Sequence, residues 1–205
     1  MKSQAWTDIL KVLERWSPLG ETKASTGARL IGHVPHVAPL AYFHLVYLPL
    51  GTPEIEQLEK LAQRPIPRAY SEFLSISNGA NLFNDKLRLN GLRMSYNRDP
   101  DASCLPYALE TANTHERPTG SPDDVVFFGG YSFDGSRLWM RPGDPKVYRC
   151  PRREFLPTLN TWPSFEAMLE AEVNRLALRF DERGVLIDPN TPTTPPVDGV
   201  PPPGH

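Results

Sequence analysis

Two histidines, His33 and His36, have the spacing of half a metal site. Imidazole is a preferred zinc ligand, but a zinc site needs a third ligand and usually a fourth. No cysteine, glutamate or further histidine follows at ligand spacing, and Pro35 breaks any helix that would place both rings on one face. The sequence therefore predicts no metal site. His44 alternates within an expected strand and is predicted to be a packed or edge residue.

Four aspartates lie close to prolines, where a pair of carboxylates would suit acid–base catalysis: Asp99, Asp101, Asp123 and Asp124. Carboxylates brought close together shift each other's pKa, as a catalytic pair requires. Aspartate beside proline is, however, a frequent turn sequence. We interpret these residues as turn residues and predict no catalytic residue, and a hydrolase that uses these acids is kept as an alternative.

Nucleophilic and phosphate-binding arrangements are not indicated either. The chain has no G-x-S-x-G motif, and its two cysteines, Cys104 and Cys150, form no C-x-x-C pair. Gly129-Gly130 is not followed by a helix that would hold a phosphate at its N-terminus. The sequence therefore predicts a protein that is not an enzyme, has no cofactor and carries two reduced thiols, as is usual in a cytoplasm.

The overall charge and the apolar segments restrict the classes of partner. The chain has 205 residues, a formal net charge of -2 and a pI near 6.2, so its charge does not suggest nucleic acid as a direct partner. The N-terminus lacks the continuous apolar region of a signal peptide, and the apolar run Leu40–Leu50 is too short to cross a bilayer. We predict a cytoplasmic protein with no membrane partner, and the sequence does not indicate its oligomeric state.

Aromatic residues and acids alternate in the central part of the chain. Five of them fall together in expected turns and form the candidate binding residues: Tyr96, Asp99, Asp101, Tyr131 and Asp134. Exposed tyrosines flanked by acids suit a protein-binding surface. The alternative is ordinary packing of the tyrosines with solvated acids around them.

The elements that would position these residues are helices first and strands later. Apolar spacing and capping residues predict helices over 53–63, 67–77 and 164–183, after a first helix near Trp6. Between Gly79 and Pro151 the pattern is that of short strands separated by glycine-containing turns, which predicts an antiparallel meander. This order of elements predicts the α+β class.

Segments at both ends of the chain extend this pattern. The first 51 residues predict a helix and two strands, Arg29–Val34 and Ala41–Leu48. Residues 187–205 are rich in proline and have almost no apolar residues to bury. Such a composition predicts an extended or disordered, solvated tail.

The stretch Ile66–Gly79 carries the most specific pattern. Pro67 begins a helix on which Tyr70, Phe73 and Leu74 share one side, and Asn-Gly ends it. A leucine-containing acidic helix precedes this stretch, and a short strand, a meander and a closing helix that begins SFEAML follow it. Over about residues 52–184 this ordered set resembles the SUKH superfamily (SMI/KNR-like), whose pattern includes "lP..y..fl...NG" and a closing "sf..fl" helix.

The resemblance implies a fold, a division of the chain and a function. The fold is a twisted, mainly antiparallel sheet with helices packed on it. The chain divides into an N-terminal extension packed on the core (1–51), a SUKH-like domain (52–186) and a Pro-rich flexible tail (187–205). Members of the superfamily act by binding proteins, and they include fungal cell-wall-synthesis regulators and bacterial immunity proteins.

We therefore expect a non-enzymatic immunity protein whose partner is a cognate bacterial toxin of a polymorphic or contact-dependent system. The alternative is an intracellular regulatory or scaffold protein that binds other proteins. A toxin that acts on nucleic acid has a basic active-site cleft. Acidic groups among the five candidate binding residues would then complement the charge of that cleft, and the tyrosines would anchor the complex.

Overall fold

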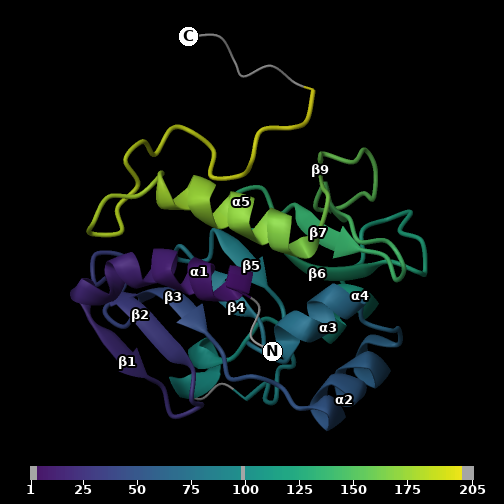
Figure 1. Cartoon of the computed structure of the whole chain (residues 1–205), viewed down its shortest axis with the longest axis horizontal. Helices are drawn as coiled ribbons and strands as arrows, with labels where there is room; N and C mark the ends of the chain where they lie inside the picture. Colours follow the sequence, from purple (N-terminus) through teal and green to yellow (C-terminus); the bar gives the residue numbers. More distant parts are fainter. Residues whose placement is uncertain (1–3, 98–99, 200–205) are drawn as a thin grey trace.

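A single antiparallel sheet organises the chain. The computed structural model describes residues 4–97 and 100–199, without the side chains of residues 100 and 101. Nine strands follow one another in the order of the sequence, and each pairs antiparallel with the next (Figure 1). Helices pack on this sheet, so the predicted α+β class with a mainly antiparallel sheet is confirmed. None of the helices in the described ranges is long and apolar enough to cross a membrane.

The strands are short, and most are connected by turns or loops. They are β1 (Glu21–Lys23), β2 (Arg29–His33), β3 (Tyr42–Val46), β4 (Ala80–Leu82), β5 (Leu87–Leu89), β6 (Val126–Tyr131), β7 (Arg137–Met140), β8 (Val147–Cys150) and β9 (Asn160–Trp162). The helical elements are α1 (Gln4–Leu13), η1 (Glu14–Leu19), α2 (Thr52–Ala62), α3 (Arg68–Leu74), η2 (Pro100–Cys104), α4 (Leu109–Thr114) and α5 (Phe165–Ala177). The exceptions among the connections are that α2 and α3 lie between β3 and β4, and that η2 and α4 lie between β5 and β6.

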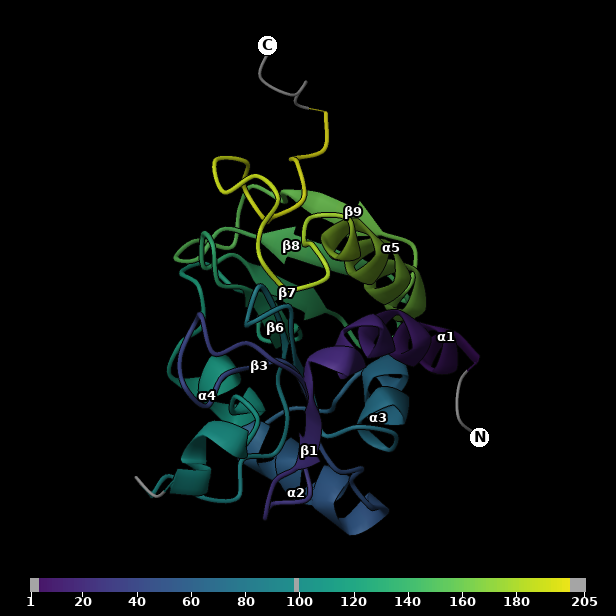
Figure 2. The ribbon, with the colours of Figure 1, turned by 90° about the vertical axis from the view of Figure 1, so that its left-hand side faces the viewer.

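The two faces of the sheet carry different layers. In β6, Val126 and Phe128 belong to the main core together with α1, α3 and α5, whereas Phe127 belongs to a smaller cluster that includes Ala112 of α4. Because side chains alternate across a strand, α4 covers the face opposite to α5. The helices α1 and α5 lie side by side on their own face (Figure 1 and Figure 2).

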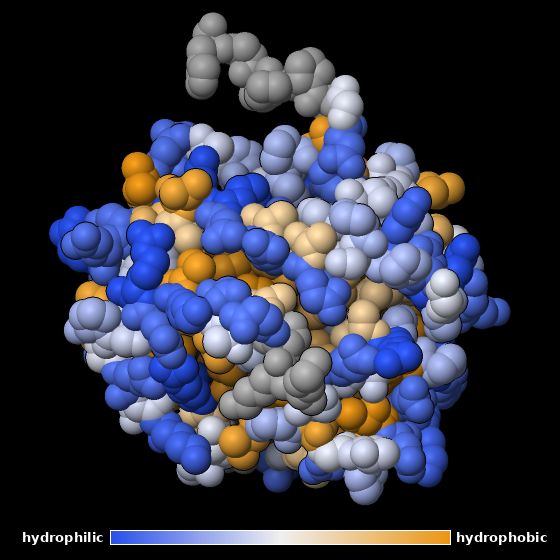
Figure 3. Space-filling view, viewed as in Figure 1, coloured by the Kyte–Doolittle hydropathy of each residue, from blue (hydrophilic) through white to orange (hydrophobic). Residues whose placement is uncertain are grey.

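Aromatic contacts join the helices on the α5 face. The ring of Phe73 lies 5.1 Å from that of Trp6 and 5.2 Å from that of Phe165, so one side chain of α3 contacts both α1 and α5. A hollow of about 320 Å³ remains between these three helices. Figure 3 shows apolar residues gathered over this side of the molecule.

The Ile66–Gly79 stretch builds the centre of the fold through polar contacts as well as packing. The Tyr70 hydroxyl, fully buried, donates to the carbonyl of Asn90 and, at 3.1 Å, to that of Phe128. The Asn78 amide accepts from the Leu92 N–H at 2.6 Å and donates to the Leu92 carbonyl at 2.9 Å. The stretch therefore fastens the helix to the sheet, which explains its pattern without any catalytic role.

Gly79 is required by both its conformation and its surroundings. Its φ is +83°, in the left-handed region, and a Cβ there would lie 2.3 Å from the Leu89 carbonyl oxygen. Only glycine allows the chain to turn from α3 into β4 against β5 at this distance.

Tyr70→Phe is expected to lower the free energy of unfolding by about 1–2 kcal/mol, because it removes a buried donor and leaves the Asn90 carbonyl without it. Tyr42→Phe is the matched control, since the Tyr42 hydroxyl, in a half-buried side chain, has no hydrogen-bond partner within residues 4–97 and 100–199. Urea unfolding should place the control within about 0.5 kcal/mol of the parent. Equal stability of the two variants would contradict the role assigned to the hydroxyl.

The last helix is shorter than predicted. It ends at Ala177 instead of residue 183, and Phe180 forms an isolated antiparallel bridge with Leu186. The Asp181 carboxylate accepts from the N–H groups of Arg183 and Val185, both at 2.9 Å, and these bonds compete with the helical pattern. Gly184, with φ +73°, therefore lies in this turn and does not end the helix.

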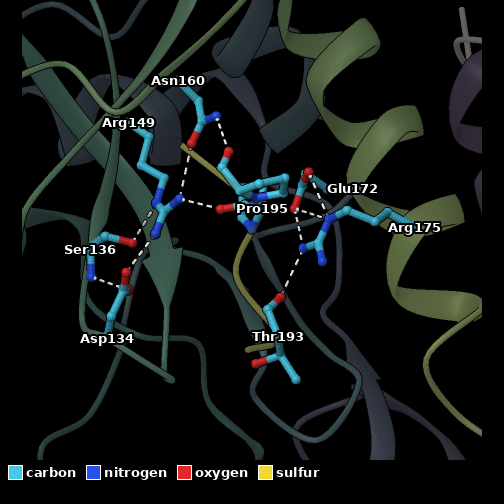
Figure 4. Close-up of polar contacts among 9 residues, drawn as sticks. Asp134, Ser136, Arg149, Asn160, Glu172, Arg175, Thr193 and Pro195 are labelled. Carbon is cyan, nitrogen blue, oxygen red and sulfur yellow. Dashed lines mark hydrogen bonds and ion pairs between the residues drawn. The ribbon is translucent and has the colours of Figure 1, made fainter. Parts of the chain in front are cut away.

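The C-terminal segment also differs from the expectation over residues 187–199. Thr193 and Pro195 are buried, and the carbonyl of each accepts from an arginine: Arg175 donates to Thr193 at 2.8 Å, and Arg149 donates to Pro195 at 2.8 Å (Figure 4). In Figure 2 the segment runs over β8 and α5. Proline lacks a donor and restricts the unfolded chain, so a proline-rich segment can be held through its carbonyls with little apolar burial.

The N-terminal segment is part of the same sheet and core. It contributes three strands, one more than predicted, since β1 precedes the expected pair. Its Trp16 is buried, lies 4.9 Å from the Phe43 ring, and donates from the indole nitrogen to the Asp181 carbonyl at 2.9 Å. The first and last parts of the chain are thus joined directly.

Candidate functional site

A cleft of about 750 Å³ lies against β5, β6 and β7 and brings together three of the five predicted binding residues. Tyr96, Tyr131 and Asp134 all contribute to its lining. Asp99 lies outside the described residues. Asp101 lies in η2, and its side chain is also outside the described part. The other elements of the wall are α4, the residue 132–136 hairpin turn and the exposed Arg152.

Tyr96 is the predicted residue whose position fits the expectation best. Its side chain is 64% exposed, and its hydroxyl donates to the Glu110 carboxylate of α4. The Arg93 guanidinium lies 5.7 Å from the ring centroid. Partial burial and the bond to Glu110 both raise the pKa of the Tyr96 hydroxyl. The ring is therefore held at the edge of the cleft with one face available to solvent.

Tyr131 is not in an exposed turn, and that expectation is wrong. It is only 2% exposed, because β6 continues through Gly129-Gly130 to Tyr131, with a register shift between Phe127 and Gly129. Burial is the largest cause that raises the pKa of Tyr131 well above its ordinary value, and the negative charge of Glu172 on α5 is the second. The ring thus faces α5, and Tyr131 contributes to the structure behind the cleft.

Asp134 lies at the rim, but its carboxylate is engaged. It accepts from the Ser136 N–H at 2.8 Å and from the Arg149 guanidinium at 2.5 Å (Figure 4). Arg149 is 2% exposed, so this ion pair is anchored in the interior. Asp134 therefore fixes the β6–β7 turn, which differs from the free acidic group that the sequence predicts there.

Four arginines line the cleft and were not among the predicted residues: Arg88, Arg93, Arg137 and Arg152. Arg88 lies 4.3 Å from the Tyr107 ring centroid and 3.7 Å from Asp85. Arg137 pairs with Glu116 at 3.1 Å. The sequence does contain a signal for Arg88 and Arg137. Each alternates with apolar residues, in L-R-L and R-L-W-M, and this alternation predicts that the arginines lie on the face opposite the main core.

Arg93, which lines the cleft, is bonded to the segment that leads into α4. Its guanidinium donates at 3.0 Å to the Pro106 carbonyl and at 3.0 Å to the Ala102 carbonyl. Neutral carbonyl groups do not cancel its charge. The cleft therefore combines a positive lining with the exposed aromatic ring of Phe133, which is 56% exposed.

The Cys150 thiol and the His44 imidazole lie away from this cleft. Burial raises the pKa of the Cys150 thiol to about 12, which keeps it protonated and poorly nucleophilic at neutral pH. Burial lowers the pKa of His44 to about 3. No group of three or more histidine, cysteine, aspartate or glutamate residues in the described ranges is arranged to hold a metal ion. The geometry of the cleft suits binding through charge and aromatic contacts.

Comparison with known proteins identifies the family. A model of the SMI1/KNR4 family (SUKH-1) matches residues 49–171, more than half of the chain. The matched region runs from α2 to the first half of α5 and includes every residue that lines the cleft. The C-terminal segment that contacts Arg149 lies outside the matched region. A search among curated proteins finds no match. The chain belongs to the SMI1/KNR4 family (SUKH-1).

Proposed function

We propose that this protein is a non-enzymatic, cytoplasmic immunity protein that binds and neutralises a cognate bacterial toxin. The observation that carries the proposal is the cleft, where arginines of the sheet and the exposed ring of Tyr96 adjoin an exposed phenylalanine. Arginine and large aromatic residues supply most of the binding energy in protein interfaces. Membership of the SUKH-1 family supports the proposal, because the superfamily that the sequence resembles includes immunity proteins.

In this proposal the protein neutralises the toxin by covering its active site. The sheet and the bonds of Arg93 and Asp134 hold the cleft walls in place before binding. A preformed surface loses little conformational entropy on association, which favours a tight complex. The partner's active site is covered, and no bond is made or broken by this chain.

The proposal is tested first in cells. The gene next to the one that encodes this chain is expressed alone and together with it. Growth arrest by the neighbouring protein, relieved by co-expression of this chain, supports immunity. A neighbouring protein that binds this chain without arresting growth supports the regulatory or scaffold alternative instead.

Phe133→Ala is expected to weaken binding to the toxin by at least about tenfold, because an exposed aromatic side chain in such a cleft is a typical anchor. Isothermal titration calorimetry with the full chain measures the effect. Leu178→Ala is the matched control, since Leu178 is 76% exposed and does not line the cleft. A loss of affinity in the control but not in Phe133→Ala would move the interface away from the cleft.

A further inference from the structure

Arg88 and Arg137 lie on either side of Gly130 in one row across three strands. Arg88 of β5 pairs with Gly130 of β6, and Gly130 pairs with Arg137 of β7. Adjacent strands are about 4.8 Å apart, so the backbones of the two arginines are separated by roughly 10 Å. Gly130 places no side chain between them, and all three residues line the cleft.

The charges that line the cleft do not balance. Arg88 and Arg137 each have one acid nearby, Asp85 at 3.7 Å and Glu116 at 3.1 Å. Glu116 and Asp134 are the acids among the lining residues of the described chain, and Asp134 is paired with Arg149, which does not line the cleft.

The other two arginines add positive charge. Arg93 is bound only to neutral carbonyls in the contacts described above, and Arg152 has no acidic partner in residues 4–97 and 100–199. The cleft is therefore positive although the whole chain carries a formal net charge of -2.

Two of the arginines also have unused donors. The Nε atoms of Arg88 and Arg137 are buried and have no hydrogen-bond acceptor within the described part of the chain. The two side chains are 32% and 18% exposed, so they lie in a partly desolvated setting. A charge-assisted bond is stronger there than at an open surface, and a carboxylate can accept two such bonds from one guanidinium.

We propose that the cleft receives an acidic segment of the protein partner, with an aspartate or glutamate carboxylate seated between Arg88 and Arg137. An apolar side chain of the same segment packs on Phe133, which is exposed at the rim. The inference rests on the proposed function for the existence of a protein partner. It reverses the charge expected from the sequence, in which this chain supplies the acids and the partner the basic groups.

A protein segment fits the cleft better than a nucleic acid. Glu110 of α4 accepts from the Tyr96 hydroxyl at the edge of the cleft, and Glu116, just after α4, is paired with Arg137. A continuous phosphate backbone would be repelled by these two carboxylates. A single carboxylate flanked by apolar residues avoids that repulsion. The adjoining rings of Tyr96 and Phe133 are of the kind that protein interfaces use.

The test uses the full chain and synthetic fluorescent heptapeptides, each with a central glutamate and a phenylalanine two or three positions away. Every peptide has a counterpart with glutamine in place of glutamate. Fluorescence polarisation should show that glutamate peptides bind more tightly than their glutamine counterparts. Arg88→Gln and Arg137→Gln should each weaken that binding about 10- to 100-fold, as expected for a hydrogen-bonded charge.

Arg141→Gln is the matched control, because Arg141 forms an exposed ion pair with Asp124 outside the cleft. Urea midpoints show whether each variant remains folded, and Arg152→Gln, an exposed position, provides a third cleft variant that is not part of the sheet. Equal affinity for glutamate and glutamine peptides, no binding by any peptide, or equal losses in the control would overturn the inference. Tighter binding of a single-stranded oligonucleotide through the same arginines would overturn it as well.

The same variants separate this inference from the proposed function. If the toxin complex forms with unchanged affinity in Arg88→Gln and Arg137→Gln, the acidic segment is wrong and the immunity proposal stands. If glutamate peptides bind as expected but no neighbouring toxin is neutralised, the cleft serves an acidic partner of another kind.

Discussion

Arg149→Met is expected to lower the free energy of unfolding by about 3–5 kcal/mol, the range found when one partner of a buried ion pair is removed. The Arg149 guanidinium donates to Ser136 Oγ at 2.7 Å, Asn160 Oδ1 at 2.9 Å, the Pro195 carbonyl at 2.8 Å and Asp134 Oδ2 at 2.5 Å (Figure 4). Methionine fills a similar volume but leaves all four acceptors without this donor. Equilibrium urea unfolding measures the loss.

Two further variants define the cause of that loss. Arg141→Met removes an ion pair whose side chains are 42% and 57% exposed, and it should cost no more than about 1 kcal/mol. Arg149→Lys retains the charge but has a single nitrogen, so it cannot reach the same four acceptors and should give an intermediate loss. If Arg149→Met were no less stable than Arg141→Met, the network would not hold the fold together.

The Arg149 network also couples the C-terminal segment to the cleft. Pro195 is on one side of the guanidinium, and Asp134 of the cleft rim is on the other. Removal of residues 191–205 should therefore lower the free energy of unfolding less in the Arg149→Met variant than in the parent, since both changes break the contact between Arg149 and Pro195. Additive losses would show that the two act independently.

Local signals made the centre of the fold predictable. Pro67 presets φ at the start of α3, apolar spacing places Tyr70 and Phe73 on one side, and Gly79 permits the left-handed turn that follows. Each signal acts within a few residues of its own position. The helix and its junction with the sheet could therefore be derived without tertiary information.

The cleft could not be derived in the same way, because it depends on strand register. Arg88 and Arg137 are 49 positions apart and become neighbours of Gly130 only through the pairing of β5, β6 and β7. Beyond the register shift between Phe127 and Gly129, β6 continues to Tyr131, so a residue expected in a turn is buried instead. A change of one residue in register reverses which face each side chain occupies.

The contacts of the C-terminal segment could not be predicted, for a different reason. Its composition has few apolar residues, and the sequence gives no sign that Arg149 and Arg175 will be placed beneath it. Burial of Arg149 depends on acceptors from three distant segments of the chain, the positions of Asp134, Asn160 and Pro195. Such a set is determined only once the sheet has formed.

His44 should make the protein sensitive to mild acid. It is completely buried; its Nδ1 accepts from the Phe83 N–H at 3.2 Å, and its Nε2 has no partner in the described part of the chain. The rings of Phe43 and Phe83 lie 4.6 and 4.7 Å away. This apolar setting disfavours the charged imidazolium, and burial lowers the pKa of His44 from 6.5 to about 3.

The direction of the pH dependence follows from that pKa. Below pH 6.5 the unfolded chain binds a proton at His44 while the folded chain does not, so stability present above 6.5 is lost as the pH falls towards about 3. Each pH unit in this window costs up to about 1.4 kcal/mol, which amounts to roughly 4–5 kcal/mol in all. Between pH 6.5 and 5 the expected loss is about 2 kcal/mol.

Urea unfolding of the parent and of His44→Asn at pH 7, 6 and 5 tests this prediction. The asparagine amide oxygen can replace Nδ1 as the acceptor for Phe83 but does not titrate, so the variant should lose this part of the pH dependence. His36→Asn, at an exposed position, should retain it. Carboxylates with lowered pKa values, such as Glu21 and Asp144, also stabilise the folded chain, and this stabilisation is lost on their protonation only at lower pH. The comparison therefore stops at about pH 5. A parent and a His44→Asn variant with the same slope would show that His44 is protonated in the folded chain or does not control its response to acid.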